Sequence, residues 1–236
     1  MPCDEATPGP RSGAAVGALA ALGPFFQVES VVDGGDWRPL RDLGTGLALE
    51  QRVAHVGDAL GRLAGADVEP RVAASTLSLG LFARVLSPSL GAAALGILLP
   101  RPTLDDAYWK PVTAGPWPLA LTGAATTPDL TRLLVDVVEP LIEAMAEGYA
   151  LSRQVLWGNA ASALFGSARM LGVARRELAA RAEAEAAALL AGPLAGTGGL
   201  DDGFVRSSCC LYYRIPGGGY CGDCVLAHRP AVPAPR

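Results

Sequence analysis

Histidine, aromatic side chains and charge are all scarce in this chain of 236 residues. It has 2 histidines, 6% aromatic residues and 18% charged residues, whereas half of all its residues are hydrophobic. Few aromatics combined with abundant alanine and leucine favour helices over sheet. A chain this apolar is able to bury a sizeable core, so general disorder is not expected.

Positive charge of the kind that binds nucleic acid is also missing. The formal net charge is −4, from 19 Lys and Arg against 23 Asp and Glu. The sequence contains no basic stripe that would neutralise phosphate groups along a nucleic acid. We therefore expect no nucleic-acid partner.

The chain has no uninterrupted apolar run long enough to span a membrane. The nearest approach is 77–100, which Arg84, Pro88 and two serines interrupt, whereas a bilayer requires roughly twenty apolar residues in a row. The apolar stretch 14–26 has no basic region before it and does not look like a signal peptide. These features predict a soluble, cytoplasmic protein without stable membrane insertion, in a compartment that keeps thiols reduced.

The spacing of apolar residues predicts most of the helices. Ser87-Pro88 is expected to end one helix, because proline disrupts a helix interior. Thr127 is expected to cap another, with Pro128 in the first helical position, where its missing N–H costs nothing. The expected helices cover 47–63, 70–86, 89–99, 128–148, 150–171 and 174–191.

Short strands complete a mainly α-helical α+β fold with a small β-hairpin or sheet element. Residues 25–32 have β character, and the stretch 100–127, with five prolines and two tryptophans, predicts a hairpin or edge strands. The expected organisation is a disordered leader (1–13), a mainly helical domain (14–192), a flexible linker (193–203), a short C-terminal module (204–228) and a disordered tail (229–236).

The cysteines are few but concentrated. Four of the five lie within sixteen residues, as the vicinal pair Cys209-Cys210, a ten-residue gap, and Cys221-x-x-Cys224. Thiols gathered in this way are typical of one metal centre, because cysteine spacing determines which sulfurs can converge. Cys3 lies in the expected leader, and we expect it to be inert.

Three chemistries are open to these four thiols. A Cys209–Cys210 disulfide would be strained, because adjacent Cα atoms lie about 3.8 Å apart, and a reducing compartment disfavours the other pairings. Structural zinc suits Cys221-x-x-Cys224, but vicinal side chains diverge and converge poorly on a single ion. A [2Fe–2S] cluster also takes four cysteines, and its two irons spread the terminal sites widely enough to accommodate that divergence.

Residues around the cysteines suit a negatively charged centre. Pro216 and the three glycines after it allow a close backbone approach, and N–H donors to sulfur raise a reduction potential. Arg206 and Arg214 flank the motif and are placed to offset the charge of a tetrathiolate centre. The alternative is that both are solvated or pair with nearby acids, namely Asp201, Asp202 or Asp223.

Other polar residues have structural explanations as well as functional ones. Arg84 lies in an apolar helix, where it is expected to pair with a buried acid or, alternatively, to contact an anionic ligand. Trp157 is expected in the core, and Asn159 is expected to cap a helix. His228 is expected to be a bystander to the four cysteines, and His55 a packing or surface residue.

At the cysteine motif the chain resembles the FhuF-like ferric-siderophore reductase family, whose C-terminal module carries Cys-Cys, ten residues and Cys-x-x-Cys around a [2Fe–2S] cluster. The resemblance extends upstream, to roughly residues 45–228. It includes Arg71-Val-Ala-Ala-Ser75, Gly80, Arg84, Ser87-Pro88, the hairpin that bears Trp109, and Leu156-Trp-Gly-Asn-Ala-Ala-Ser162.

This resemblance implies a cytoplasmic ferric-siderophore reductase that transfers one electron to siderophore-bound Fe(III) and releases Fe(II). It places the [2Fe–2S] cluster on Cys209, Cys210, Cys221 and Cys224. The sequence has no glycine-rich dinucleotide motif between a strand and a helix, so we expect an external electron donor of the ferredoxin or flavin-reductase type. The alternative is a non-catalytic siderophore-binding protein stabilised by an Fe–S cluster or by zinc.

Overall fold

The computed structural model describes residues 10–29, 35–44, 46–113 and 115–227. The α-helices are α1 (Pro10–Ala20), α2 (Leu47–Ala64), α3 (Pro70–Leu95), α4 (Leu130–Leu133), α5 (Glu139–Tyr149), α6 (Arg153–Ala174) and α7 (Ala179–Leu190). Shorter helical turns are η1 (Leu40–Gly44), the π-turn η2 (Leu134–Val138), η3 (Arg176–Leu178) and η4 (Tyr212–Arg214). The strands are β1 (Arg38–Pro39), β2 (Leu99–Pro100), β3 (Ala107–Trp109), β4 (Leu119–Leu121), β5 (Ala125–Thr126), β6 (Gly198–Asp201) and β7 (Gly203–Arg206). Helices with small sheets confirm the mainly α-helical α+β class.

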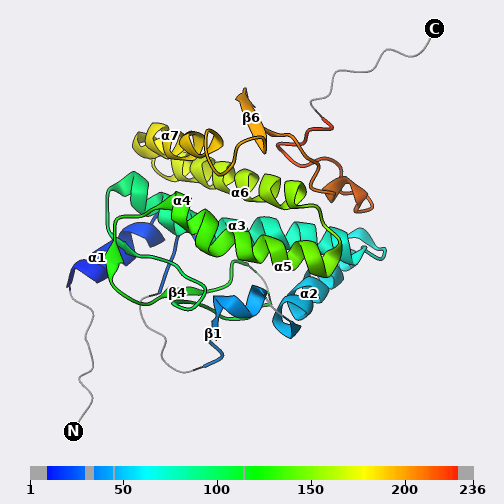
Figure 1. The fold of residues 1–236 in the computed structure, drawn as a ribbon, viewed down its shortest axis with the longest axis horizontal. Coiled ribbons are helices and arrows are strands. Elements are labelled where there is room, and N and C mark those ends of the chain that lie inside the picture. Colours follow the sequence, from blue (N-terminus) through cyan, green and yellow to red (C-terminus); the bar gives the residue numbers. More distant parts are fainter. Residues whose placement is uncertain (1–9, 30–34, 45, 114, 228–236) are drawn as a thin grey trace.

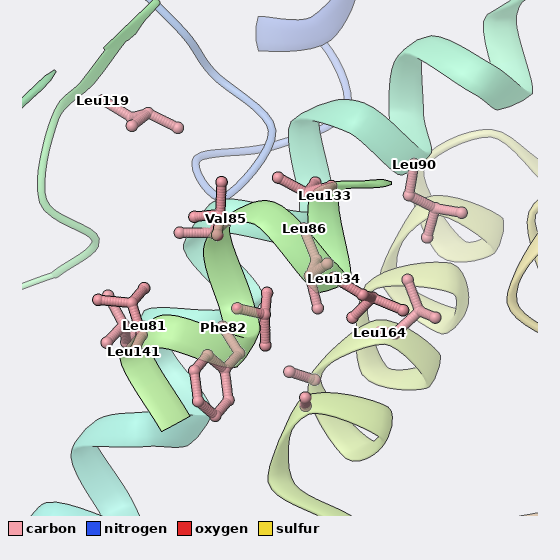
Figure 2. Close-up of a cluster of buried hydrophobic side chains, with 14 of the residues drawn as sticks. Leu81, Phe82, Val85, Leu86, Leu90, Leu119, Leu133, Leu134, Leu141 and Leu164 are labelled. Atoms are coloured by element: carbon pink, nitrogen blue, oxygen red, sulfur yellow. The ribbon is translucent and has the colours of Figure 1, made fainter. Parts of the chain in front are cut away.

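Helix α3 is the centre of the fold. It contacts α1, α2, α4, α5, α6 and α7, and Figure 1 shows it running behind α4 and α5, with α6 above. Figure 2 shows five of its apolar side chains among leucines from the surrounding elements: Leu81, Phe82, Val85, Leu86 and Leu90 of α3, with Leu119, Leu133, Leu134, Leu141 and Leu164. Within the described residues, α3 alone is long and apolar enough to cross a membrane, but 78% of its most apolar window is buried inside the protein. It is therefore a core helix.

The expected end of this helix at Ser87-Pro88 is wrong. Helix α3 continues through Pro88 to Leu95, although an interior proline costs a helix about 3 kcal/mol. Leu86 and Leu90 are fully buried on either side of it, and burial of each large apolar side chain contributes about 1.5–3 kcal/mol. Tertiary packing therefore outweighs the local signal, and the separate helix expected over 89–99 is the C-terminal part of α3.

The expected hairpin is confirmed. Strands β3 and β4 pair antiparallel, with Trp109 opposite Leu119, and β1 adds to the free edge of β3. Strands β2 and β5 form a separate antiparallel pair. The strand expected over 25–32 is reduced in the described residues to one isolated bridge between Glu29 and Ala120. Residues 30–34 lie outside the described part of the chain.

The ends of several helices differ from the sequence-based expectations. Helix α1 begins at Pro10, inside the expected leader, and residues 1–9 are not described. The expected cap Thr127 is wrong: Asp129 caps α4, and its carboxylate accepts the backbone N–H of Arg132 at 2.9 Å. Ser152 caps α6 in the same way, accepting the N–H of Val155 at 3.2 Å.

The segment 193–203, expected to be a flexible connector, contains strand β6. This strand pairs antiparallel with β7 along its whole length, from Gly198 opposite Arg206 to Asp201 opposite Gly203. Thr197, just before the hairpin, is buried. The hairpin leads directly into the cysteines, so it helps to position them. The expected tail over 229–236 lies outside the described residues.

Candidate metal centre

The four cysteines lie on two loops that follow the β6–β7 hairpin. Cys209 and Cys210 come directly after β7, and Cys221 and Cys224 come after η4. In Figure 1 this C-terminal segment, drawn in orange, covers the N-terminal part of α6, and η4 is in contact with α3. The centre is therefore built on the two helices that form the core of the fold.

One sulfur–sulfur contact joins the two loops. The Sγ atoms of Cys210 and Cys221 lie 3.4 Å apart. Cys210 and Cys224 are buried, whereas Cys209 and Cys221 are half-buried, and the four form no disulfide with one another. The disulfide alternative is therefore absent from these four residues.

The backbone turns sharply after the vicinal pair. Leu211 has φ +67°, a left-handed conformation that leucine rarely adopts. In this turn the N–H of Leu211 donates to Cys209 Sγ at 3.4 Å, and the N–H of Tyr212 bonds to Cys210. The N–H groups that donate to sulfur therefore belong to the two residues directly after the vicinal pair. In the glycine loop, where such donors were expected, the N–H of Gly218 instead donates to the carbonyl of Ile215 at 2.9 Å.

The thiols interact electrostatically. The hydrogen bond between Cys210 and Cys221 lowers the pKa of Cys210 to about 6 and raises the pKa of Cys221. Burial raises the pKa of Cys209, which also feels the charges of Cys210 and Cys224. Each of the four thiols therefore interacts electrostatically with at least one of the others. No group of three or more His, Cys, Asp or Glu side chains within the described ranges is arranged to hold a single metal ion, so the use of all four thiols as ligands stays a prediction at this point.

Arg206 is the cation of the site. It is 1% exposed at the end of β7, and its Nη2 donates to the carbonyl oxygen of Gly158 at 2.7 Å. Its Nε lies 3.4 Å from Asp223 Oδ2, yet Nε and Nη1 have no hydrogen-bond acceptor. The charge of Arg206 favours the ionised forms of Cys209, Cys210 and Cys221. Arg206 therefore pairs with Asp223, one of the acids considered in the sequence, and its role in offsetting the charge of a cluster stays a prediction.

Arg214 has a different partner from those considered in the sequence. Its Nη2 lies 2.6 Å from the carboxylate of Glu69, the residue that precedes α3. Both side chains are substantially exposed, so this ion pair contributes little to stability. Arg214 thus ties η4 to the start of α3.

A buried polar network holds the backbone of Cys210. The hydroxyl of Ser75 on α3 donates to the carbonyl oxygen of Cys210 at 2.7 Å. Asn159 on α6 donates from Nδ2 to the carbonyl of Ser75 at 3.0 Å and to Ser78 Oγ at 2.7 Å. The expectation that Asn159 caps a helix is wrong, because it lies inside α6 and is fully buried. Sequence reasoning missed Ser75 and Ser78, although polar residues on apolar helices are a signal that a buried partner exists.

Gly158 permits the close approach of the cysteine loop to α6. A Cβ atom at this position would lie 2.5 Å from Ser208 Oγ, and Ser208 in turn donates to the carbonyl of Gln154 at 3.1 Å. A side chain at 158 would therefore require the Ser208 hydroxyl to rotate away and give up this hydrogen bond, or the loop to shift. Two of the upstream segments that carry the resemblance, 71–75 and 156–162, supply contacts to the cysteine loop.

The remaining polar residues singled out in the sequence do not belong to the centre. Arg84 donates to three backbone carbonyls, those of Trp117, Phe25 and Gln27, and burial lowers its pKa to about 10. Its hydrogen-bond acceptors are therefore carbonyls, whereas the acid expected near it is represented by Glu29, whose charge acts to raise the pKa of Arg84. Trp157 is half-buried and packs against the core, and His55 Nε2 lies 3.2 Å from the carbonyl of Thr113. Cys3 and His228, for which the sequence also gave predictions, lie outside the described residues.

Comparison with known proteins identifies the cysteine segment. Residues 206–226 match the family model of the FhuF 2Fe-2S C-terminal domain, whereas no curated protein matches the chain. The matched segment contains Arg206 and all four cysteines. Four thiols in electrostatic contact, beside a buried guanidinium with two unused donors, fit a tetrathiolate cluster of net negative charge. The segment 206–226 is therefore similar to the FhuF 2Fe-2S C-terminal domain, and this match supports a [2Fe–2S] cluster at the four cysteines.

Proposed function

We propose that this protein is a cytoplasmic oxidoreductase that reduces siderophore-bound Fe(III) to Fe(II) and so releases the iron. The observation that carries this proposal is the set of four interacting thiols in a segment that matches the FhuF 2Fe-2S C-terminal domain. In this proposal Cys209, Cys210, Cys221 and Cys224 are the cluster ligands. The ferric siderophore is the substrate.

The chemistry requires one electron and no acid–base group. Siderophores hold iron through hard oxygen donors, which bind Fe(III) far better than Fe(II), so a single electron weakens the complex. The bound [2Fe–2S] cluster supplies electrons one at a time, which matches this need. The scarcity of histidine in the chain, with 2 residues, is consistent with a reaction that needs no general base.

The chain's own residues hold and tune the centre. Arg206 places a buried positive charge beside the thiols, which favours the extra negative charge of the reduced state. Ser75 and Asn159 fix the backbone of Cys210 through hydrogen bonds between two core helices. Electrons enter from an external donor of the ferredoxin or flavin-reductase type, because the sequence has no dinucleotide-binding motif of its own.

The first test is spectroscopic. Protein purified without oxygen is measured by visible absorption, EPR and metal analysis, before and after dithionite. We expect a red-brown protein with two irons per chain and an EPR signal that appears on one-electron reduction. A colourless protein with one zinc would remove the cluster and the reductase function together.

The second test links the cluster to activity. The dithionite-reduced protein is mixed with ferric siderophores, and Fe(II) is trapped with a chromogenic chelator. Cys221→Ser is expected to abolish both the colour and the reduction, whereas Cys3→Ser, which changes the one cysteine outside the motif, leaves both intact. Reduction that persists in a cluster-free Cys221→Ser protein would contradict the mechanism, and an intact cluster that reduces no ferric siderophore would leave a binding protein.

A further inference from the structure

We propose that the acidic groove between α6, α7 and the β6–β7 hairpin is the surface on which the external electron donor docks, and that this donor is a redox protein with a basic rim around its one-electron group. This inference rests on the proposed function, in which an external protein reduces the cluster. In Figure 1 the hairpin, labelled at β6, stands beside α6 and α7. The groove between them has a volume of about 750 Å³, which is large enough to receive side chains of a docked partner.

The groove reaches the loop that carries the second pair of cysteines. Gly222 and Asp223, the two residues between Cys221 and Cys224, form part of its wall. Gly222 is exposed, and a Cβ atom built on it would have no atom within 4 Å, so the loop is open to the groove at this residue. Electron transfer slows steeply with distance. A donor seated in the groove would be separated from the thiols by this loop alone.

The charges on the groove are unbalanced. Four carboxylates line it, against one guanidinium, that of Arg169: the carboxylates belong to Glu183, Asp201, Asp202 and Asp223. Asp223 has Arg206 within 3.4 Å, but Glu183, Asp201 and Asp202 are exposed and leave an excess of negative charge. A cluster held by four thiolates adds to this excess. Such a face repels an acidic protein and steers a basic one toward it.

An exposed apolar side chain lies beside these carboxylates. Leu200 on β6 is 55% exposed, lines the groove and directly precedes Asp201. Interfaces between redox partners are small, at the low end of the range for protein complexes, and an apolar contact with a polar rim is the usual arrangement. Leu200 with its acidic neighbours fits an encounter of this kind.

Packing holds the hairpin in place on α6. The rings of Phe165 on α6 and Phe204 on β7 stack with their centroids 4.5 Å apart and their planes 7° from parallel. A Cβ atom at Gly198 would lie 2.5 Å from both Phe204 and the carbonyl of Val205, so the strand packs closely against this stack. A donor therefore meets a surface that is already formed, and docking orders little of the chain.

The charge of the groove distinguishes between the two donor types expected from the sequence. Ferredoxins are acidic proteins, so this face repels them. A flavin reductase that exchanges electrons with an acidic ferredoxin must present a basic docking face, and such a face complements the groove. The donor that fits is therefore of the flavin-reductase type. One electron passes from the reduced donor to the oxidised cluster, and no bond forms or breaks.

The electrostatic test measures electron exchange with a basic redox protein. The probe is ferricytochrome c, whose exposed haem edge is surrounded by lysines. It accepts one electron from the reduced, cluster-loaded protein after removal of dithionite, and stopped-flow absorbance gives the second-order rate constant. In the double variant Asp201→Asn with Asp202→Asn, both substituted side chains are exposed at the tip of the hairpin, so the change to amides preserves their size and the fold.

The double amide variant should exchange electrons with cytochrome c more slowly than the wild type. We expect the rate constant to fall roughly three- to tenfold at low salt, because the variant loses two steering charges. The difference should disappear at roughly 0.5 M salt, where charges are screened within a few ångströms. Cytochrome c with succinylated lysines, which keeps the haem but has an acidic rim, should show the opposite order, with the variant faster than the wild type.

A matched control removes the same charge elsewhere. Asp58 and Asp67 are exposed and line a separate cavity of about 740 Å³ between α2 and α3, none of whose lining residues belongs to the cysteine segment. Asp58→Asn with Asp67→Asn should change the rate constant by less than about twofold. An equal effect of the two double variants would mean that net charge, and not the groove, steers the partner.

The apolar contact has its own matched pair of substitutions. Leu200→Thr removes the exposed leucine but keeps a residue that suits a strand. Leu98, which is 56% exposed and does not line the groove, provides the control Leu98→Thr. Leu200→Thr should slow electron exchange with cytochrome c by roughly two- to fivefold at high salt as well as at low salt, because the lost contact is apolar. Leu98→Thr should react as the wild type does.

The donor type is tested by the direction of the salt effect. The oxidised cluster is reduced either by a flavin reductase of the ferredoxin-reductase type with its nicotinamide cofactor, or by reduced ferredoxin. Added salt should slow the first reaction and speed the second, because the groove attracts a basic face and repels an acidic one. A reaction with ferredoxin that slows as salt is added would overturn the assignment of a basic donor.

The outcomes separate the docking surface from the function. If the wild type reduces ferric siderophores while Leu200→Thr and the double amide variant exchange electrons with cytochrome c as the wild type does, the groove is not the docking surface, and the reductase proposal stands. If electron exchange depends on the groove as expected but the protein reduces no ferric siderophore, the reductase proposal fails and the docking surface stands. Melting temperatures, visible spectra and reduction potentials of all variants show whether the fold and the cluster are preserved.

Discussion

The hydroxyl of Ser75 donates to the carbonyl oxygen of Cys210 at 2.7 Å, although 135 residues separate the two in the chain. Ser75 lies on the core helix α3, and Cys210 belongs to the vicinal pair of the cluster domain. Asn159 on α6 donates to the carbonyl oxygen of the same serine at 3.0 Å. The cluster domain is therefore locked to the two central helices, and the helical part of the chain acts as its scaffold.

Ser75→Ala is expected to destabilise the protein and to speed the loss of the cluster. The substitution leaves a buried carbonyl of Cys210 without its donor, at a cost of about 1–3 kcal/mol. The free energy of unfolding in urea and the decay of visible absorbance in the presence of a chelator report the two effects. Thr76→Val is the control, because that hydroxyl bonds only within α3, to the carbonyl of Val72 at 3.0 Å. Equal effects of both substitutions would mean that the link between Ser75 and Cys210 contributes nothing specific.

Gly158→Ala is expected to destabilise the protein although alanine is the better helix former. A Cβ atom at 158 would meet Ser208 Oγ at 2.5 Å, and overpacking of this kind costs about 1–3 kcal/mol. Gly166, on the same helix, has no atom within 4 Å of a built Cβ, so Gly166→Ala should stabilise by up to about 1 kcal/mol. Thermal and urea unfolding of both variants give the comparison.

Combining Gly158→Ala with Ser208→Ala tests whether the Ser208 hydroxyl causes the expected destabilisation. Removing the hydroxyl in Ser208→Ala leaves only contacts of 3.8 Å or more to the added methyl group. Gly158→Ala should therefore cost much less in the Ser208→Ala background than in the wild type. If its cost is the same in both backgrounds, the clash with Ser208 is not what requires glycine at this position.

Elements with a strong local signal could be predicted from the sequence, and elements decided by tertiary packing could not. Helix α2 and the β3–β4 hairpin follow from apolar spacing and from the proline-rich flanks of the hairpin. Pro88 is a local signal for a helix end, but the burial of Leu86 and Leu90 outweighs it, and the helix continues. Strand β6 contains two glycines and no β-branched residue, so its pairing with β7 had no signal in its own residues.

The candidate site shows the same difference between features that have a local sequence signal and features that depend on tertiary contacts. The spacing of the cysteines predicts a metal centre, because all four lie within one short segment. Ser75 donates to Cys210 across 135 positions of the chain, and Asn159 donates to Ser75 across 84 positions, so no local pattern encodes either contact. Arg206 was placed near the thiols by its sequence position, but only the structure shows that it is buried with two nitrogen atoms unused.

Arg84→Leu is expected to be among the most destabilising single substitutions in the chain. It removes the donor from the buried carbonyl of Trp117 and from the part-buried carbonyls of Phe25 and Gln27, and a buried acceptor left without a partner costs about 1–3 kcal/mol. Arg71→Leu, on an exposed position of the same helix, should change the free energy of unfolding by no more than about 0.5 kcal/mol. Urea unfolding checks both. A stable Arg84→Leu protein that has lost siderophore binding would return Arg84 to the role of an anion-binding residue.

Arg206→Gln is expected to lower the reduction potential of the cluster. The buried guanidinium favours the reduced state, which carries one more negative charge, so its removal disfavours the added electron. A unit charge close to the cluster in a protein interior corresponds to a shift on the order of 100 mV. Spectroelectrochemical titration of the visible bands gives the potential directly, without any substrate.

Two further variants separate charge from packing at this position. Arg206→Lys keeps the positive charge but loses the donor to Gly158, so its potential should lie closer to that of the wild type than the potential of Arg206→Gln does. Arg214→Gln should shift the potential much less, because Arg214 is partly exposed and paired with Glu69 at 2.6 Å. An equal shift for Arg206→Gln and Arg214→Gln would mean that general surface charge sets the potential. A wild-type potential in Arg206→Gln would remove the tuning role of Arg206 and leave it a structural link between β7 and α6.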